Sequence, residues 1–78
     1  MKLSEAINKR IYYFLELNNM KPYTLYKNTG ISRSTISTFL NKPNSLPKID
    51  TILHVCEGCN ITLGEFFSDP IFDEAEQD

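Results

Sequence analysis

Apolar residues recur along most of this chain at the three- and four-residue spacing that buries one face of an α-helix. The first such segment follows Ser4, a residue type that often caps helices, and places Ile7 and Leu15 on one side. It stops near Asn18–Met20, where two asparagines favour a turn. The pattern therefore predicts a first helix that begins at Ser4 and ends around Asn18–Met20.

Two shorter helices are expected next, joined at a glycine. Pro22 suits a first helical position, because its missing N–H would have no partner there, and this second helix should reach about Thr29. Gly30 fits the left-handed residue that commonly ends a helix. Ser32 can then cap a third helix over about residues 32–40. Its inward face would carry three apolar residues: Ile36, Phe39 and Leu40.

Two more helices follow the proline-containing loop at 41–48. The fourth should bury Ile49, Ile52, Leu53 and Cys56 on one face. Asn60 can adopt the left-handed conformation that ends it, and Thr62 with Glu65 forms a capping box that begins the fifth helix. No segment reads convincingly as a strand, so the sequence predicts an all-α, compact five-helix domain.

Length and composition limit the class of protein. The 78 residues suffice for one small core, and 41% apolar and 12% aromatic content favour a packed domain over disorder. No apolar run approaches the length of a membrane span, and the first residues lack the apolar centre of a signal peptide. We therefore expect a cytoplasmic protein with no membrane partner.

The charges are strongly segregated along the chain. The formal net charge is −2, but residues 17–49 contain five basic residues and no acidic one, whereas residues 65–78 contain six acidic residues and no basic one. Without 65–78, eight basic residues face four acidic ones, a net charge of +4. A merely solvated face usually mixes both signs, so the acid-free middle points to a basic surface. We expect an acidic, flexible tail over 68–78, which could fold back onto that surface.

The two cysteines, Cys56 and Cys59, are expected to pack in the core. A structural zinc site needs four ligands, and His54 is the only histidine in the chain. Nothing in the sequence supports an enzyme, since paired carboxylates in a plausible cleft and a phosphate-binding glycine loop are both missing. No metal and no cofactor are expected, although metal sharing between molecules stays open.

The second and third expected helices, with the glycine turn between them, have the form of a helix-turn-helix. The second helix of such a unit enters the DNA major groove. Short hydroxyl side chains allow close approach to base edges, and an arginine near the helix start, here Arg33, can bind the O6 and N7 atoms of guanine. The absence of acidic residues over 17–49 suits contact with phosphates.

The segments "TLYKNTGISRSTISTFLN" and "IDTILHVCEGCNITLGEFF", with the apolar first helix, resemble the lambda-repressor-like (Cro/CI-type, XRE family) helix-turn-helix regulators over about residues 3–67. The resemblance implies a helix-turn-helix DNA-binding domain over residues 1–67. It implies a sequence-specific transcriptional regulator, in our interpretation a repressor, that binds double-stranded operator DNA as a homodimer. It implies base contacts from Arg33, Ser34, Ser37 and Thr38. It implies phosphate contacts near Tyr23, Asn41, Lys42 and Asn44.

Two positions depart from the family pattern. Pro22 stands where the family often has a phosphate-binding glutamine, so Tyr23 or Lys27 would take over that contact. Tyr26 stands where a small alanine usually lets the two helices pack closely. The alternative function is a protein-interaction module, such as an antitoxin, whose surface near Tyr12 and Tyr13 and acidic tail would bind a partner protein.

Overall fold

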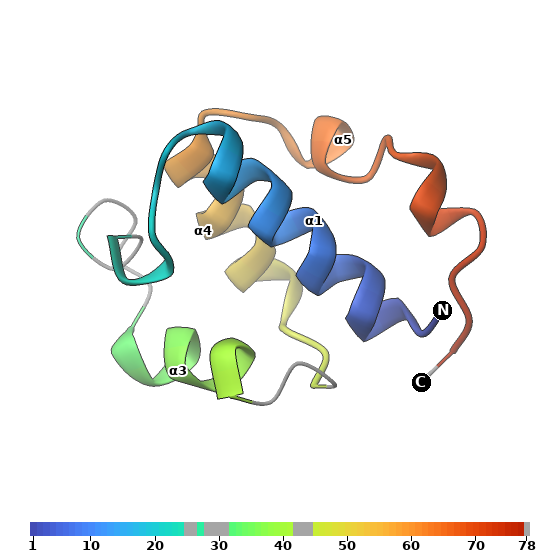
Figure 1. Ribbon diagram of the computed structural model, residues 1–78, viewed down its shortest axis with the longest axis horizontal. Helices are drawn as coiled ribbons and strands as arrows, with labels where there is room; N and C mark the ends of the chain where they lie inside the picture. The colour runs from blue at the N-terminus through green and yellow to red at the C-terminus, as the bar shows by residue number, and fades with distance from the viewer. Residues whose placement is uncertain (25–26, 28–31, 42–44, 78) are drawn as a thin grey trace.

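The computed structural model describes residues 1–24, 27, 32–41 and 45–77, without the side chains of residues 36 and 39–41. The described helices are α1 (Leu3–Leu17), η1 (Pro22–Thr24), α3 (Arg33–Asn41), α4 (Ile49–Cys59), α5 (Leu63–Phe66) and η2 (Pro70–Phe72), where η marks a 3₁₀ helix. Figure 1 shows α1 lying across α4, with α3 at one edge of the molecule. Over the described residues the chain forms helices and no strand, which agrees with an all-α class.

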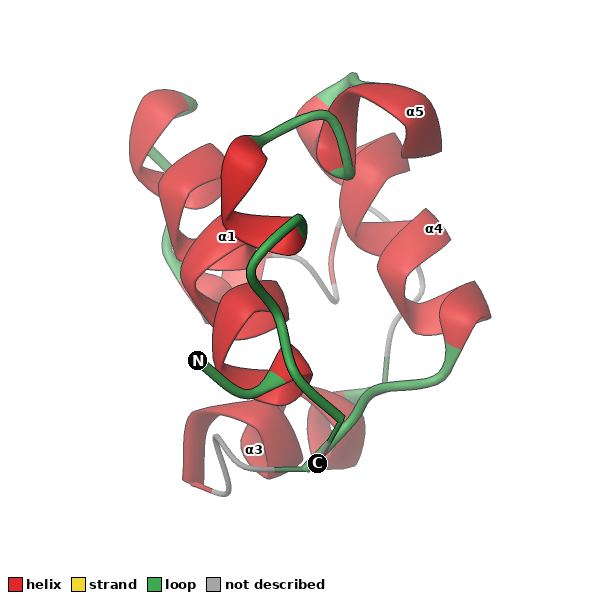
Figure 2. Ribbon diagram, turned by 90° about the vertical axis from the view of Figure 1, so that its right-hand side faces the viewer, coloured by secondary structure: helices red, strands yellow, loops and turns green. Residues whose placement is uncertain are grey.

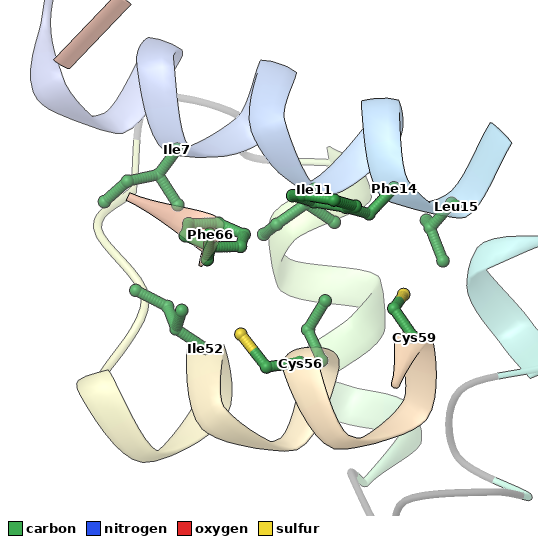
Figure 3. Close-up of a cluster of buried hydrophobic side chains, with 9 residues drawn as sticks. Ile7, Ile11, Phe14, Leu15, Ile52, Cys56, Cys59 and Phe66 are labelled. Atoms are coloured by element: carbon green, nitrogen blue, oxygen red, sulfur yellow. The ribbon is translucent and has the colours of Figure 1, made fainter. Parts of the chain in front are cut away.

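The core lies between α1, α4 and α5. Figure 3 shows side chains from the three helices pointing toward one another, with Phe66 of α5 between the two longer helices. Phe66 is fully buried and stacks on Phe14 of α1, with ring centroids 6.1 Å apart. The buried cluster consists of Ile7, Ile11, Phe14, Leu15, Ile52, Val55, Cys56, Cys59 and Phe66. Burial of these apolar side chains is what holds the short helices together.

The expected count of five α-helices is corrected to four among the described residues. The second expected helix, over 22–29, falls largely on residues outside the description, and its described first turn, Pro22–Thr24, is a 3₁₀ helix. Three expected helix ends are confirmed. The Ser32 hydroxyl accepts from the N–H of Thr35, Asn60 is left-handed with φ of 61°, and Thr62 forms a capping box with Glu65.

The expected start of α1 at a Ser4 cap is wrong. Lys2 occupies the cap position without a side-chain cap bond, and Ser4 is inside the helix and only 2% exposed. The physical reason lies at the other end of the chain. The N–H of Leu3 donates to the carbonyl oxygen of Glu76 at 2.9 Å, so a distant backbone group satisfies a donor that a side-chain cap would otherwise take.

The expected buried face of α4 is partly wrong. Ile52 and Cys56 are buried as expected, but Ile49 is 62% exposed and Leu53 is 42% exposed. Val55 and Cys59 complete the buried face instead. Because α1 and α5 cover only one side of α4, the helix is rotated so that its 52–55–56–59 face meets them. Ile49 and Leu53 are left on the outer side.

The described part of the C-terminal segment, Ser68–Gln77, returns to the start of α1, as Figure 2 shows. Phe72 of η2 packs beside Phe66 and Phe67, with ring centroids 6.1 and 4.9 Å apart. The N–H of Glu76 donates to the carbonyl oxygen of Met1 at 2.8 Å. The domain division at residue 67 stays a prediction. The short helix η2 shows that helical structure continues beyond that residue.

Arg10 joins α1 to α5. Its Nε donates to the carbonyl oxygen of Phe66 at 2.7 Å, and its Nη2 donates to that of Glu65 at 2.8 Å. Its guanidinium carbon lies 4.4 Å from the centroid of the Phe14 ring, and its Nη1 is 3.5 Å from a carboxylate oxygen of Asp69. One side chain thus satisfies carbonyl groups at the end of α5, where the helix itself offers no N–H. None of the described helices is long and apolar enough to span a membrane.

Candidate nucleic-acid interface

The start of α3 is a cluster of hydroxyl groups. The Ser32 Oγ lies 3.1 Å from the Oγ of Ser34 and 2.9 Å from the Oγ1 of Thr35, and it accepts from the N–H of Thr35 at 3.2 Å. Thr35 therefore bonds within the first turn of the helix. Ser32 and Ser34 are exposed, so the cluster faces solvent at the positive end of a helix. Such an end favours negatively charged groups such as DNA phosphates.

Four side chains expected to read bases lie on α3. Arg33, Ser34 and Thr38 are exposed, and Ser37 is half-buried. Thr38 lies one turn after Ser34, and its Oγ1 donates to the carbonyl oxygen of Ser34 at 2.8 Å. At 100° per residue, these four positions fall within about 140° of the helix circumference. The geometry therefore allows one face of α3 to present an arginine and three small hydroxyl side chains.

A basic hollow lies between the first turn of η1 and the start of α3. Its lining residues are Lys21, Tyr23, Thr24, Lys27 and Arg33. Three of these five carry a positive charge, and η1 and α3 are in contact. A concave surface lined by cations concentrates positive potential and favours phosphate groups. The structure thus brings Arg33, expected to contact bases, beside Tyr23 and Lys27, expected to contact phosphates.

Two tyrosines, Tyr12 and Tyr23, lie near each other, and Tyr23 lines this hollow. Burial raises the pKa of Tyr12, and the neighbouring Tyr23 raises it further. The Tyr12 phenol therefore stays protonated well above neutral pH. Tyr23 itself is exposed, so its hydroxyl is accessible to a ligand. A phenol can donate to a phosphate oxygen without adding the charge repulsion that a carboxylate would introduce.

A second hollow separates α3 from the start of α4. It is lined by Thr35, Thr38, Ser45, Leu46, Pro47, Lys48, Asp50 and Thr51. Asp50 bonds to the backbone of its own helix, because its carboxylate accepts the N–H of Thr51 at 2.9 Å. Sequence reasoning assigned no role to Ser45 and Lys48. In the sequence, both residues are marked only by lying in the loop that follows the third helix. Many loop residues share that position, so it does not identify a site.

The remaining expected phosphate contacts are only partly described. Asn41 ends α3, and its side chain lies outside the description. Lys42 and Asn44 also lie outside the described residues. The assignment of DNA contacts to particular residues therefore stays a prediction. Among the described residues, it is supported by the exposure of Arg33, Ser34 and Thr38 and by the basic hollow.

The two cysteines lie away from the basic hollow, in the core between α1 and α4. Both are buried free thiols. Burial raises the pKa of Cys56 to about 11, with a smaller contribution from Cys59, and burial also raises the pKa of Cys59. Thiols held protonated in this way are poor nucleophiles and poor metal ligands. Their placement agrees with a packing role. Among the described residues no group of three potential metal-ligating side chains comes together.

A short exposed polar helix beside a basic hollow is the kind of surface that helix-turn-helix domains present to DNA. The family model of the Cro/C1-type HTH DNA-binding domain matches residues 10–70, which is most of the chain. The chain therefore belongs to the Cro/C1-type HTH DNA-binding domain family. This confirms the family that the sequence resembled. Comparison with curated proteins and with solved structures found no match.

Proposed function

We propose that this protein is a sequence-specific regulator of transcription that inserts α3 into the major groove of double-stranded DNA. The observation that carries the proposal is the basic hollow of Lys21, Lys27 and Arg33 beside the hydroxyl-rich face of α3. Phosphates on one strand would lie against the hollow while base edges face α3. In this arrangement the lysines supply sequence-independent affinity, and the α3 side chains supply discrimination between bases.

Within that complex Arg33, Ser34, Ser37 and Thr38 would contact bases. Arg33 lies at the first position of α3, where a long side chain can reach the groove floor. The phosphate contacts would come from Tyr23, Lys27, Asn41, Lys42 and Asn44. The acid-free stretch over residues 17–49 supports both sets, since no carboxylate in it would repel the DNA backbone.

Repression is the simplest regulatory role for such a protein. Occupying a site that overlaps a promoter suffices to block transcription, whereas activation also requires a surface that recruits the polymerase. A DNA target also implies the compartment that holds the DNA, and we propose the cytoplasm as the location.

We further propose that the protein binds a two-fold DNA site as a homodimer. Ile49 and Leu53 are exposed apolar side chains one turn apart on α4, and Leu46 is exposed in the loop before the helix. Lys48 precedes the helix, and Glu57 lies toward its end. If two α4 helices pack antiparallel, Lys48 of each copy approaches Glu57 of the other, which makes the surface self-complementary. Three partly exposed side chains make a small interface, so we expect dimerisation mainly on DNA.

The test is selection of bound sequences from a random duplex DNA pool at about 150 mM salt, where screening approaches physiological conditions. Enrichment of a palindrome with half-sites about one helical turn apart would support dimeric major-groove binding. Arg33→Ala should then weaken specific binding by about 5- to 150-fold and non-specific binding far less. Lys9→Ala is the matched control, because Lys9 is exposed on α1 beside Arg10 and Asp69.

Three outcomes would each contradict one part of the proposal. Equal losses of specific and non-specific binding in Arg33→Ala would remove this residue from base recognition. If no sequence is enriched and only weak, salt-sensitive binding is seen, the protein-interaction module with a partner protein becomes the better interpretation. Leu53→Glu should abolish cooperative binding to the full palindrome while leaving half-site binding intact, and retained cooperativity would exclude the α4 surface as the dimer interface.

A further inference from the structure

The hydroxyl of Thr38 has its only proton already in use. Its Oγ1 donates to the carbonyl oxygen of Ser34 at 2.8 Å, one turn earlier in α3. A hydroxyl group has one proton and two lone pairs. While this bond is kept, the exposed Thr38 oxygen can only accept hydrogen bonds from a ligand.

The hydroxyl cluster at the start of α3 is different. The Ser32 Oγ uses one lone pair on the N–H of Thr35 and lies within hydrogen-bond distance of two further hydroxyls. With one lone pair and one proton left, it accepts from one of these hydroxyls and donates to the other. Among the described residues, either Ser34 or Thr35 therefore has a hydroxyl proton that no bond within this cluster uses, and reversing both bonds exchanges the two roles. Ser34 can thus act as donor or acceptor toward DNA.

We infer that Thr38 is a specificity-determining residue that selects a base bearing an exocyclic amino group in the major groove, namely adenine or cytosine. In that groove the adenine N6 and cytosine N4 amino groups donate hydrogen bonds, whereas guanine O6 and N7 and thymine O4 only accept them. An oxygen restricted to accepting matches the first pair. This inference rests on the proposed insertion of α3 into the major groove.

The size of the preference follows from the cost of turning the hydroxyl. To face guanine O6 or thymine O4, Thr38 must withdraw its proton from the Ser34 carbonyl oxygen, and so lose one hydrogen bond. The net value of such a bond corresponds to a factor of about 2 to 13 in an equilibrium constant. The selectivity for an amino-bearing base over guanine or thymine should therefore be about two- to tenfold at a single position.

The experiment compares the full-length wild type with Thr38→Val and Thr38→Ser in the same random-pool selection. Valine has nearly the shape of threonine but no oxygen, and serine keeps the hydroxyl and its ability to bond to the carbonyl four residues earlier. We expect one site position to prefer adenine or cytosine in the wild type and in Thr38→Ser, and to lose that preference in Thr38→Val. Other positions should keep theirs.

A second measurement isolates the amino group. If adenine is selected, its replacement by a purine base without the 6-amino group should weaken wild-type binding by about two- to tenfold and leave Thr38→Val binding unchanged. Equal losses in both proteins would overturn the inference. So would a selected position that prefers guanine or thymine, or one unaffected by Thr38→Val. Failure of the wild type to enrich any sequence would instead contradict the proposed function itself.

Discussion

Arg10 should be one of the most important polar side chains for stability, although it lies far from α3. Its side chain is only 11% exposed and donates to the carbonyl oxygens of Phe66 and Glu65. We consider Arg10→Met, which keeps an apolar chain of similar length and removes every donor. After this change Arg10 no longer satisfies the Phe66 carbonyl, whereas the Glu65 carbonyl still accepts the Ser68 hydroxyl at 2.8 Å.

The expected loss follows from these contacts. A hydrogen bond from a charged group contributes about 1.5–3 kcal/mol, and the guanidinium over the Phe14 ring adds about 0.5–1 kcal/mol. The pair with Asp69 adds little, because that carboxylate is 42% exposed and its contact is long, at 3.5 Å. We expect Arg10→Met to cost about 2–4 kcal/mol, a large part of the roughly 4–12 kcal/mol typical for 78 residues.

The assay is urea denaturation followed by circular dichroism, with a thermal melt as a second measure. At this chain length the expected loss lowers Tm by roughly 10–25 °C. Lys9→Met is the control, since Lys9 neighbours Arg10 on α1 but is exposed. If the two variants lose stability equally, by less than about 0.5 kcal/mol, the reasoning about the end of α5 is refuted.

Four further predictions concern the core, one helix end and the C-terminal segment. The Cys56 and Cys59 thiols should react slowly with iodoacetamide until urea unfolds the chain, and fast labelling of the native protein would contradict their burial. Because the pKa of Cys56 is raised to about 11 in the fold, the unfolded chain loses this proton first, so urea midpoints should fall as pH rises from about 9 to 11. Because φ of Asn60 is 61°, Asn60→Gly should leave the free energy of unfolding within about 0.5 kcal/mol of the wild type, and Asn60→Val should lower it by about 1–2 kcal/mol. Equal urea midpoints for the two variants would argue against a left-handed residue at this position. Truncation after Phe67 should lower the free energy of unfolding by about 2 kcal/mol or more, because the aromatic packing of Phe72 is lost. It should change non-specific DNA affinity by less than about twofold at 150 mM salt. An unchanged urea midpoint would show that the segment does not stabilise the fold.

Features set by neighbouring residues could be predicted from the sequence. The Ser32 cap and the Thr62–Glu65 capping box each involve a side chain and an N–H group three residues apart, and the left-handed Asn60 depends on its own residue type. Their chemistry is visible in any short stretch that contains them. The motif of the third helix could be recognised for the same reason, because its hydroxyl groups and Arg33 are contiguous.

Features set by distant residues could not be predicted. The start of α1 depends on Glu76, which is 73 positions after Leu3, and no local signal indicates that contact. The side of α4 that is buried depends on where α1 and α5 cover the helix. The spacing of apolar residues placed Ile49 and Leu53 on the buried side, whereas both are exposed. The contacts of Arg10 with Phe66 and Glu65 were missed too, because a basic residue in a helix usually indicates only a solvated face.

The distribution of charge in the fold explains how a chain of net charge −2 can bind DNA. The acidic C-terminal segment contacts cations in and just before α1: Asp69 lies beside Arg10 of the helix, and Glu76 lies 4.0 Å from Lys2 at its cap position. Figure 1 places this segment at the start of α1, on the opposite side of the molecule from the N-terminal end of α3. It therefore does not cover the described cations Lys21, Lys27 and Arg33. At a Debye length of about 8 Å, acidic groups beyond that range scarcely weaken the field at α3. The arrangement of charge, and not its sum, decides whether this surface attracts a phosphate backbone.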